Sequence, residues 1–348
     1  MDPVSRQRST RQLDFIAVSK ENEVLVGASN LLNSGNWNGD LIYFGNDQDV
    51  PYNEDVFNST ESLKHYLPFS VCDGTFIEEK KIIVGNDNGM LCIYSISASE
   101  STHEGEDSDK LVFYNNVCTI EHDRSILSLS VSSDRKKVAT ASMDRSIKLW
   151  DIEMFVPETT FTNAHSHFVT CVNYKPETTA QPEAGDQPVN HVFVSTSLDG
   201  RCLLWDSRQQ FPAQVISTSK QCGYTCAEWF DNGDKLFLGC DDGTLSLFDI
   251  RNTSPANVQN YQFSDKYLNR IVPYLHNNEK YIAICEDSSN LKVFRYKSDN
   301  SLDTIYSNSD HKDYVKGLSW LNNPTDPVLL SCAWDSRVLK HYPLKSVS

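Results

Sequence analysis

Features that define several protein classes are missing from this chain of 348 residues. It has no apolar run long enough to span a bilayer, which argues against a transmembrane protein. Residues 1–12 lack the apolar core of a signal peptide. With only 31 basic residues against 47 acidic ones, the net charge of −16 disfavours nucleic acid and anionic membranes as partners and favours basic proteins. We therefore predict a cytoplasmic protein, with the nucleus as a second location.

Motifs for catalysis and for metal or cofactor binding are also missing. The chain has no phosphate-binding glycine loop and no Gly-x-Ser-x-Gly motif. Cys222 and Cys226 form the one close cysteine pair, and without a second pair or nearby histidines they make a poor zinc site. The ten cysteines are scattered through strand-like segments, so we expect reduced core residues and no disulfide framework. We predict no metal site, no cofactor and no enzymatic activity.

One segment type is present in abundance. VATASMDRSIKLWDI (138–152) reads as two strands, a tight turn and a closing Trp-Asp, and VFVSTSLDGRCLLWDSR (192–208) is a second clear copy. Five weaker copies bring the total to seven, with closing aromatic positions 43 to 56 residues apart at Phe44, Tyr94, Trp150, Trp205, Phe248, Phe294 and His341. This period predicts an all-β, seven-bladed propeller with four-stranded antiparallel blades.

The turns of the repeats agree with hairpins. Four of them carry Asn-Gly or Asp-Gly, the pairs that best tolerate the backbone of a tight hairpin turn. These pairs are Asn38-Gly39, Asn88-Gly89, Asp199-Gly200 and Asp242-Gly243.

A histidine precedes the innermost strand of three repeats, which resembles the WD-repeat family. In that family the histidine, a strand Ser or Thr, the turn Asp and the closing Trp form a buried hydrogen-bonded set. The resemblance places two complete sets here, one of His122, Thr140 or Ser142, Asp144 and Trp150, the other of His165, Ser195 or Ser197, Asp199 and Trp205. His311, Ser331 and Asp335 begin a third set, which is incomplete because His341 replaces the Trp. Repetition indicates a structural role for these histidines, not catalysis.

The repeats divide the chain into a short amino-terminal segment, residues 1–12, and a single propeller domain, residues 13–348. Inserts at 45–62, 97–111 and 176–190 are polar and acidic, so we expect them to be exposed and mobile. The seventh repeat ends near Tyr342, and residues before Leu13 are the remaining source for its outer strand. Because those residues are polar, we expect a loose seam.

Trp37 lies in the turn of the first repeat, between Asn and Gly residues. Two interpretations are open: the indole folds back over its own blade, or it is an exposed anchor for a partner protein.

The first repeat (VLVGASNLLNSGNWNGDLIYF) and the last (SDHKDYVKGLSWLNNPTDPVLLSCAWDSRVLKHYPL) resemble the methylosome WD-repeat proteins. Members of that family are partners of the symmetric (type II) protein arginine methyltransferase. The resemblance implies that the loop with Leu32, Asn33, Asn36 and Trp37 binds the methyltransferase. It further implies presentation of arginine-glycine-rich substrates, such as Sm proteins in snRNP assembly and histone tails, and Tudor-domain proteins as further partners.

A second function stays open. Trp205-Asp206-Ser207-Arg208 resembles the Trp-Asp-x-Arg box of substrate receptors for cullin-type ubiquitin ligases, and Phe248-Asp249-Ile250-Arg251 is a near match. Arginine after Trp-Asp is also common in WD repeats, so the box favours this function weakly.

Overall fold

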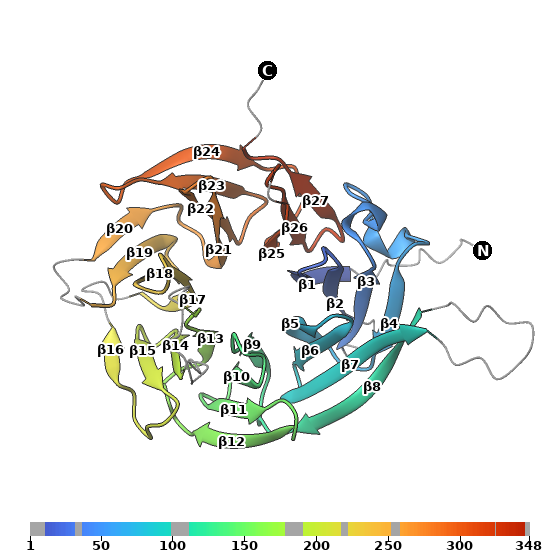
Figure 1. Cartoon of the computed structure of the whole chain (residues 1–348), viewed down its shortest axis with the longest axis horizontal. Helices are drawn as coiled ribbons and strands as arrows, with labels where there is room; N and C mark the ends of the chain where they lie inside the picture. The colour runs from blue at the N-terminus through green and yellow to red at the C-terminus, as the bar shows by residue number, and fades with distance from the viewer. Residues whose placement is uncertain are drawn as a thin grey trace, which may run out of the picture.

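Seven sheets surround a central channel in the computed structural model of the chain (Figure 1). The structure describes residues 11–31, 37–98, 111–177, 191–216, 222–251, 258–323 and 325–344. Within these ranges no helix is long and apolar enough to cross a membrane.

Blades one to four each contain four consecutive antiparallel strands. Blade one has β1 (Arg11–Val18), β2 (Val24–Leu31), β3 (Trp37–Phe44) and β4 (Leu63–Leu67). Blade two has β5 (Val71–Glu78), β6 (Lys81–Asn86), β7 (Met90–Ala98) and β8 (Leu111–Ile120). Blade three has β9 (Ile126–Val131), β10 (Lys137–Ser142), β11 (Ile147–Asp151) and β12 (Val156–Phe161). Blade four has β13 (Val169–Tyr174), β14 (Val192–Ser197), β15 (Cys202–Asp206) and β16 (Gln214–Ile216).

Blades five and six repeat this order, and blade seven has three strands among the described residues. Blade five has β17 (Tyr224–Phe230), β18 (Lys235–Cys240), β19 (Thr244–Asp249) and β20 (Gln259–Gln262). Blade six has β21 (Leu268–His276), β22 (Glu279–Glu286), β23 (Leu291–Tyr296) and β24 (Leu302–Asn308). Blade seven has β25 (Val315–Trp320), β26 (Leu329–Ala333) and β27 (Val338–His341). The predicted fold class, an all-β seven-bladed propeller, is confirmed.

The closing aromatic position of every repeat lies on the third strand of its blade. Trp150 pairs with Val138 on the second strand, and Trp205 pairs with Phe193 in the same register. The other five positions pair equivalently with Val24, Ile82, Leu236, Ile282 and Leu329. The period in the sequence therefore corresponds to one structural register repeated around the ring.

The core lies between blades rather than within them. Leu25 and Leu41 of blade one pack with Val71, Ile82 and Tyr94 of blade two in one buried cluster. Successive side chains of a strand point to opposite faces, so each sheet contributes to two such clusters, one with each neighbour.

The insert at 45–62 differs from our expectation, because it packs against blade seven. It forms two short 3-10 helices, η1 (Asp47–Asp49) and η2 (Val56–Asn58), and lies beside β27 (Figure 1). The Asn53 N–H donates to the Val338 carbonyl (3.0 Å), and the Val56 N–H donates to the Ser336 carbonyl (3.1 Å). The insert thus satisfies part of the edge that a fourth strand of blade seven would cover.

Side chains strengthen this seam. Val56 is buried in one cluster with residues of both blade one and blade seven, including Val338. Lys340 on β27 forms an ion pair with Asp47 (2.7 Å). The expectation of a loose seam is therefore wrong: apolar residues of the insert fill the gap, although its overall composition is polar.

The other predicted domain boundaries and inserts fall largely outside the described residues. Arg11 and Gln12 begin β1, the innermost strand of blade one, while residues 1–10 lie outside the described residues. Most of the inserts at 97–111 and 176–190 also lies outside them. At their borders, Ser97 and Ala98 extend β7 and Leu111 begins β8.

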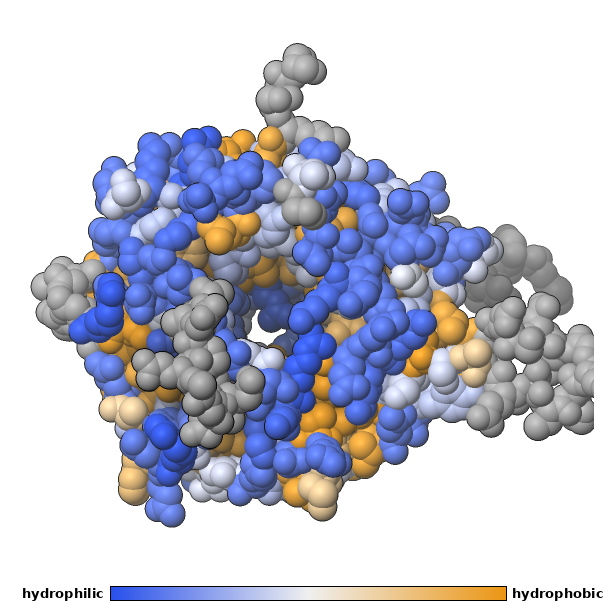
Figure 2. All heavy atoms as spheres, in the orientation of Figure 1, coloured by the Kyte–Doolittle hydropathy of each residue, from blue (hydrophilic) through white to orange (hydrophobic). Residues whose placement is uncertain are grey.

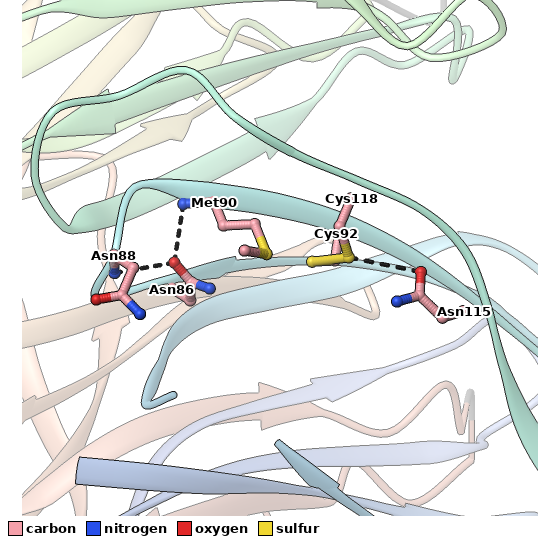
Figure 3. The surroundings of a disulfide bond; sticks show 6 residues. All are labelled: Asn86, Asn88, Met90, Cys92, Asn115 and Cys118. Atoms are coloured by element: carbon pink, nitrogen blue, oxygen red, sulfur yellow. Dashed lines mark hydrogen bonds between the residues drawn. A yellow bond between two sulfur atoms is a disulfide. The ribbon is translucent and has the colours of Figure 1, made fainter. Parts of the chain in front are cut away.

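Cys92 and Cys118 form a disulfide, which corrects our expectation that every cysteine is reduced (Figure 3). The two residues are direct partners on β7 and β8, with 4.1 Å between their Cα atoms. Upstream of Cys92, Asn86 accepts the N–H groups of Asn88 (3.0 Å) and Met90 (2.8 Å) and so fixes the turn into β7. The other eight cysteines form no disulfide.

Replacing Val56 by Ala tests the seam. We expect a loss of about 2 kcal/mol in the free energy of unfolding, because the substitution leaves a cavity between blades one and seven. The control Val156→Ala, at a position on β12 that is 49% exposed, should change the free energy by less than about 0.5 kcal/mol. Equal effects of the two substitutions in urea denaturation would contradict the closing role of the insert.

The disulfide can be tested on protein purified without reductant and alkylated before digestion. We expect mass spectrometry to recover the peptides containing Cys92 and Cys118 as one linked species that separates on reduction. The other eight cysteines should be recovered alkylated after denaturation. Recovery of Cys92 as an alkylated thiol under the same conditions would contradict the pairing.

Candidate functional site

Trp37 lies at the end of the blade-one hairpin where β2 connects to β3. It is the first residue of β3 and pairs across the hairpin with Leu31. Trp37 is 40% exposed and Leu31 is 41% exposed, so the indole is not sealed inside its own blade. Leu32, Asn33 and Asn36, predicted with Trp37 to bind a partner, lie outside the described residues.

A polar network holds this end of the hairpin. The Asn30 side chain donates to Asn38 (3.0 Å) and to Asp40 (2.9 Å), and the Asn38 amide donates to the Tyr66 hydroxyl on β4 (3.2 Å). Because these hydrogen bonds link β2, β3 and β4 and Asn30 and Asn38 are buried, the strand that carries Trp37 is fixed in position. A rigid base is what a projecting anchor residue requires.

The sequence prediction misplaced the turn of this hairpin. Asn38 and Gly39 lie inside β3, paired with Asn30 and Ser29, and are not the turn. A Cβ atom at Gly39 would come within 2.6 Å of the Phe69 carbonyl oxygen, so close backbone packing requires the glycine. The other three predicted pairs do form turns, and their glycines, Gly89, Gly200 and Gly243, have positive φ angles.

Trp37 also borders the mouth of the central channel. It lines a cavity of about 650 Å³ together with residues from the inner ends of several blades. A second cavity of about 500 Å³ lies at the opposite ends of the inner strands. Figure 2 shows an opening at the centre of the ring, bordered largely by hydrophilic residues.

An ion pair crosses the channel between the two cavities. Arg270 of blade six contacts Asp73 of blade two at 3.0 Å, and both residues line both cavities. The nearby negative charge of Asp73 raises the pKa of Arg270, which keeps the guanidinium charged. Asp73 also accepts the backbone N–H of Leu129 in blade three (3.0 Å). The pair therefore ties three blades together.

The structure brings the predicted set of blade three together. His122 donates from Nδ1 to Asp144 (2.8 Å), and the Thr140 hydroxyl, 2.8 Å from Nε2, accepts the Trp150 indole N–H (2.9 Å). Ser142, the alternative to Thr140, accepts the Asp144 backbone N–H instead.

Blade four has the same arrangement. His165 contacts Asp199 (3.1 Å) and Ser195 (2.8 Å), and Ser195 accepts the Trp205 indole N–H (2.8 Å). Burial opposes ionisation of Asp199, but the His165 and backbone hydrogen bonds prevail and lower its pKa to about 2. In both sets the hydrogen bonds that join these residues are made within one blade. The sets therefore have a structural role, which is to hold a loop against the strands of its own blade.

Blade seven completes the set that the sequence left incomplete. His311 contacts Asp335 (3.2 Å) and Ser331 (2.7 Å), as in the other blades. His341 Nε2 lies 2.8 Å from the Ser331 hydroxyl and takes the place of the indole N–H. The Tyr306 hydroxyl, 3.1 Å from Nδ1, donates to the other ring nitrogen, so one neutral tautomer of His341 satisfies both contacts.

The one group of described residues with metal-ligand spacing is Cys222, Cys240 and Asp242. The sequence spacing suggested a pair of Cys222 and Cys226. In the structure Cys222 lies beside Cys240 instead. The two sulfur atoms are 2.9 Å apart, shorter than the about 3.8 Å between two thiolates on a tetrahedral zinc ion. The cysteine geometry therefore does not fit zinc.

The two Trp-Asp-x-Arg-like segments share one local geometry. Arg208 forms a two-pronged contact with Asp206 (2.8 and 2.6 Å), and Arg251 forms the same contact with Asp249 (3.0 and 2.8 Å). Both guanidinium groups are largely exposed. Because the pairing recurs in adjacent blades, a structural role explains it without a ligase adaptor.

Comparisons with known proteins agree with this fold. The family model "WD domain, G-beta repeat" matches residues 115–151 and 155–206. The chain is 26% identical to Methylosome protein WDR77 of Xenopus laevis, over 95% of this chain and 89% of that protein. It is 30% identical to Pre-mRNA-processing factor 19 homolog 2 of Arabidopsis thaliana, over 40% of this chain and 25% of that protein. It is 27% identical to a guanine nucleotide-binding protein subunit beta of Solanum tuberosum, over 39% of this chain and 34% of that protein. The similarity to the Xenopus protein extends around the ring, and the other two similarities cover part of it.

His341 makes the stability of the ring depend on pH. Burial and the charge of His311 lower the pKa of His341 to about 4, whereas an unfolded histidine has a pKa of 6.5. The unfolded chain therefore binds a proton first as the pH falls from 6.5 to 4, and the free energy of unfolding falls by about 1.4 kcal/mol per pH unit.

Replacing His341 by Gln tests this pH dependence. Between pH 7 and pH 5, the free energy of unfolding measured in urea should fall by about 2 kcal/mol less in His341→Gln than in the wild type. The exposed control His167→Gln should retain the wild-type dependence, and an unchanged dependence in His341→Gln would contradict the assignment.

Proposed function

We propose that this WD-repeat propeller, similar along nearly its whole length to a methylosome protein, is a non-catalytic cofactor of a type II protein arginine methyltransferase. In this proposal it binds the enzyme and presents arginine-glycine-rich substrates, such as Sm proteins and histone tails, for symmetric dimethylation. It acts in the cytoplasm and the nucleus, and Tudor-domain proteins that read methylated arginine are further partners. The exposed Trp37 on a fixed hairpin, in a chain with this similarity, is the observation that carries the proposal.

The exposure of Trp37 gives the size of its contribution. At 40% exposure, about 100 Å² of the side chain remain to be buried, worth roughly 2.5 kcal/mol of gross hydrophobic free energy. Exposed Leu31 beside it adds apolar area at the same end of the hairpin. This is the range in which one tryptophan dominates the affinity of an interface.

A scaffold role suits the remaining chemistry. The His–Asp pairs of blades three, four and seven are part of hydrogen-bonded sets within their blades. The net charge of −16 favours association with basic tails and repels other acidic proteins.

Trp37→Ala tests the docking of the methyltransferase. We expect affinity for the enzyme to fall by about thirtyfold or more, corresponding to roughly 2 kcal/mol, because the apolar anchor is removed. The matched control is Phe211→Ala, which removes an aromatic side chain that is 76% exposed elsewhere on the ring. Biolayer interferometry with the purified methyltransferase measures both, and wild-type affinity in Trp37→Ala would remove the proposed anchor.

A further inference from the structure

The channel mouth beside Trp37, the cavity of about 650 Å³, carries more negative than positive charge. Its charged lining residues are Asp14, Asp73, Asp87, Asp287, Arg270 and Lys316. Four carboxylates thus face two cations in a partly enclosed space, where electrostatic interactions are stronger than on an open surface.

Both cations are already engaged by two of the carboxylates. Arg270 is paired with Asp73 at 3.0 Å, and Lys316 is paired with Asp287 at 2.6 Å. Lys316 also lies over the Trp334 ring, 4.8 Å from its centre. The mouth therefore already holds one cation by the combination of a carboxylate and an aromatic wall.

Asp14 and Asp87 are the carboxylates without an ion pair, although Ser29 contacts Asp14 and Ser70 contacts Asp87. One oxygen of Asp14 accepts the Trp334 indole N–H (3.1 Å), and its second oxygen is buried without a hydrogen-bond partner. One oxygen of Asp87 is likewise buried and unpaired. Among the described residues neither carboxylate has a cation within ion-pair distance, and buried acceptors without partners are costly.

The two carboxylates come from neighbouring blades, one and two, and line the same cavity. Asp14 is on β1, and Asp87 is in the turn after β6. Burial and the nearby charges of Asp14 and Asp87 raise the pKa of the Cys72 thiol, which lines the same cavity. Burial also raises the pKa of Asp14 to about 6, which leaves the group mostly ionised at neutral pH.

Two separate carboxylates favour a cation with several donors. Within the described part of the chain these carboxylates do not meet the ligand spacing of a metal site, which requires three ligand atoms within 4.8 Å of one another. A guanidinium has five N–H donors in a planar fork and can reach carboxylates on two sides, whereas an ammonium is a compact point charge.

We propose that this mouth binds an arginine side chain of a basic protein segment, with Asp14 and Asp87 as the partners of its guanidinium. The inference rests on the proposed function, because it gives the presented substrates a defined place on the propeller. Trp37 lines the same cavity, so in this proposal substrate and enzyme meet on one face of the ring.

Fluorescence anisotropy with a labelled peptide of alternating glycine and arginine tests the site on the full chain without the methyltransferase. Asp14→Asn with Asp87→Asn should weaken binding at least tenfold. The matched control, Glu79→Gln with Asp265→Asn, removes the same charge from exposed positions and should weaken binding less than twofold. The same peptide with lysine in place of arginine should bind the wild type at least fivefold more weakly.

If both double variants lose the same peptide affinity, the proposed site is wrong, and the peptide is held only by general attraction to the acidic surface. A second variant is needed in case the aspartate variant misfolds. Leu127 lines the mouth, so Leu127→Arg places a guanidinium there while all carboxylates remain. This guanidinium should compete with the peptide and weaken its binding. Unchanged peptide binding in Leu127→Arg would also overturn the proposal. The aspartate variant should bind the methyltransferase like the wild type, whereas failure of the proposed function would appear as unchanged enzyme binding in Trp37→Ala.

Discussion

A blade of this protein has an apolar surface on both faces of its sheet, so it is stable only with a neighbour on each side. Closure of the ring is therefore the constraint on which the other features depend, and the seam between blades one and seven is where it is met. The insert after β3 covers the edge of β27, and Val56 joins a core cluster shared by both blades. The insert follows the carboxyl end of β3, whereas Trp37 begins that strand and is held by the Asn30 and Asn38 hydrogen bonds.

Three blades of the ring satisfy the buried polar groups between loop and strand with one hydrogen-bonded set inside the blade. In blades three and four this requires a histidine, an aspartate, a hydroxyl residue and a tryptophan. Blade seven satisfies the same hydroxyl with a neutral histidine, His341, because a ring N–H can replace an indole N–H. A His–Asp pair that looks catalytic in isolation is thus explained by the hydrogen-bonding needs of the fold.

Some buried polar atoms lie outside these sets and have no partner, among them oxygens of Glu23, Asn30 and Glu286 and two oxygens at the channel mouth. Asp73 and Asp287 are paired with cations, whereas Asp14 and Asp87 keep buried oxygens without partners. Unsatisfied acceptors at the mouth of a cavity are a departure from local consistency of the kind that functional sites show. These carboxylates line the same cavity as Trp37. In our proposal, basic substrates therefore bind on the same face of the ring as the methyltransferase.

The sequence by itself determined the seven repeats, the third-strand register of each closing aromatic residue, and the residues of the His122 and His165 sets. These features depend on spacings within one repeat, and strand periodicity and turn chemistry report such spacings directly. Only the tertiary structure decided the pairing of Cys92 with Cys118, the packing of the insert on blade seven, the role of His341, and the placement of Asp14 and Asp87 in one cavity. Each of these depends on contacts whose register is not set by the repeat, either across an insert or between blades. Their geometry exists only once the sheets have twisted, packed and closed into a ring.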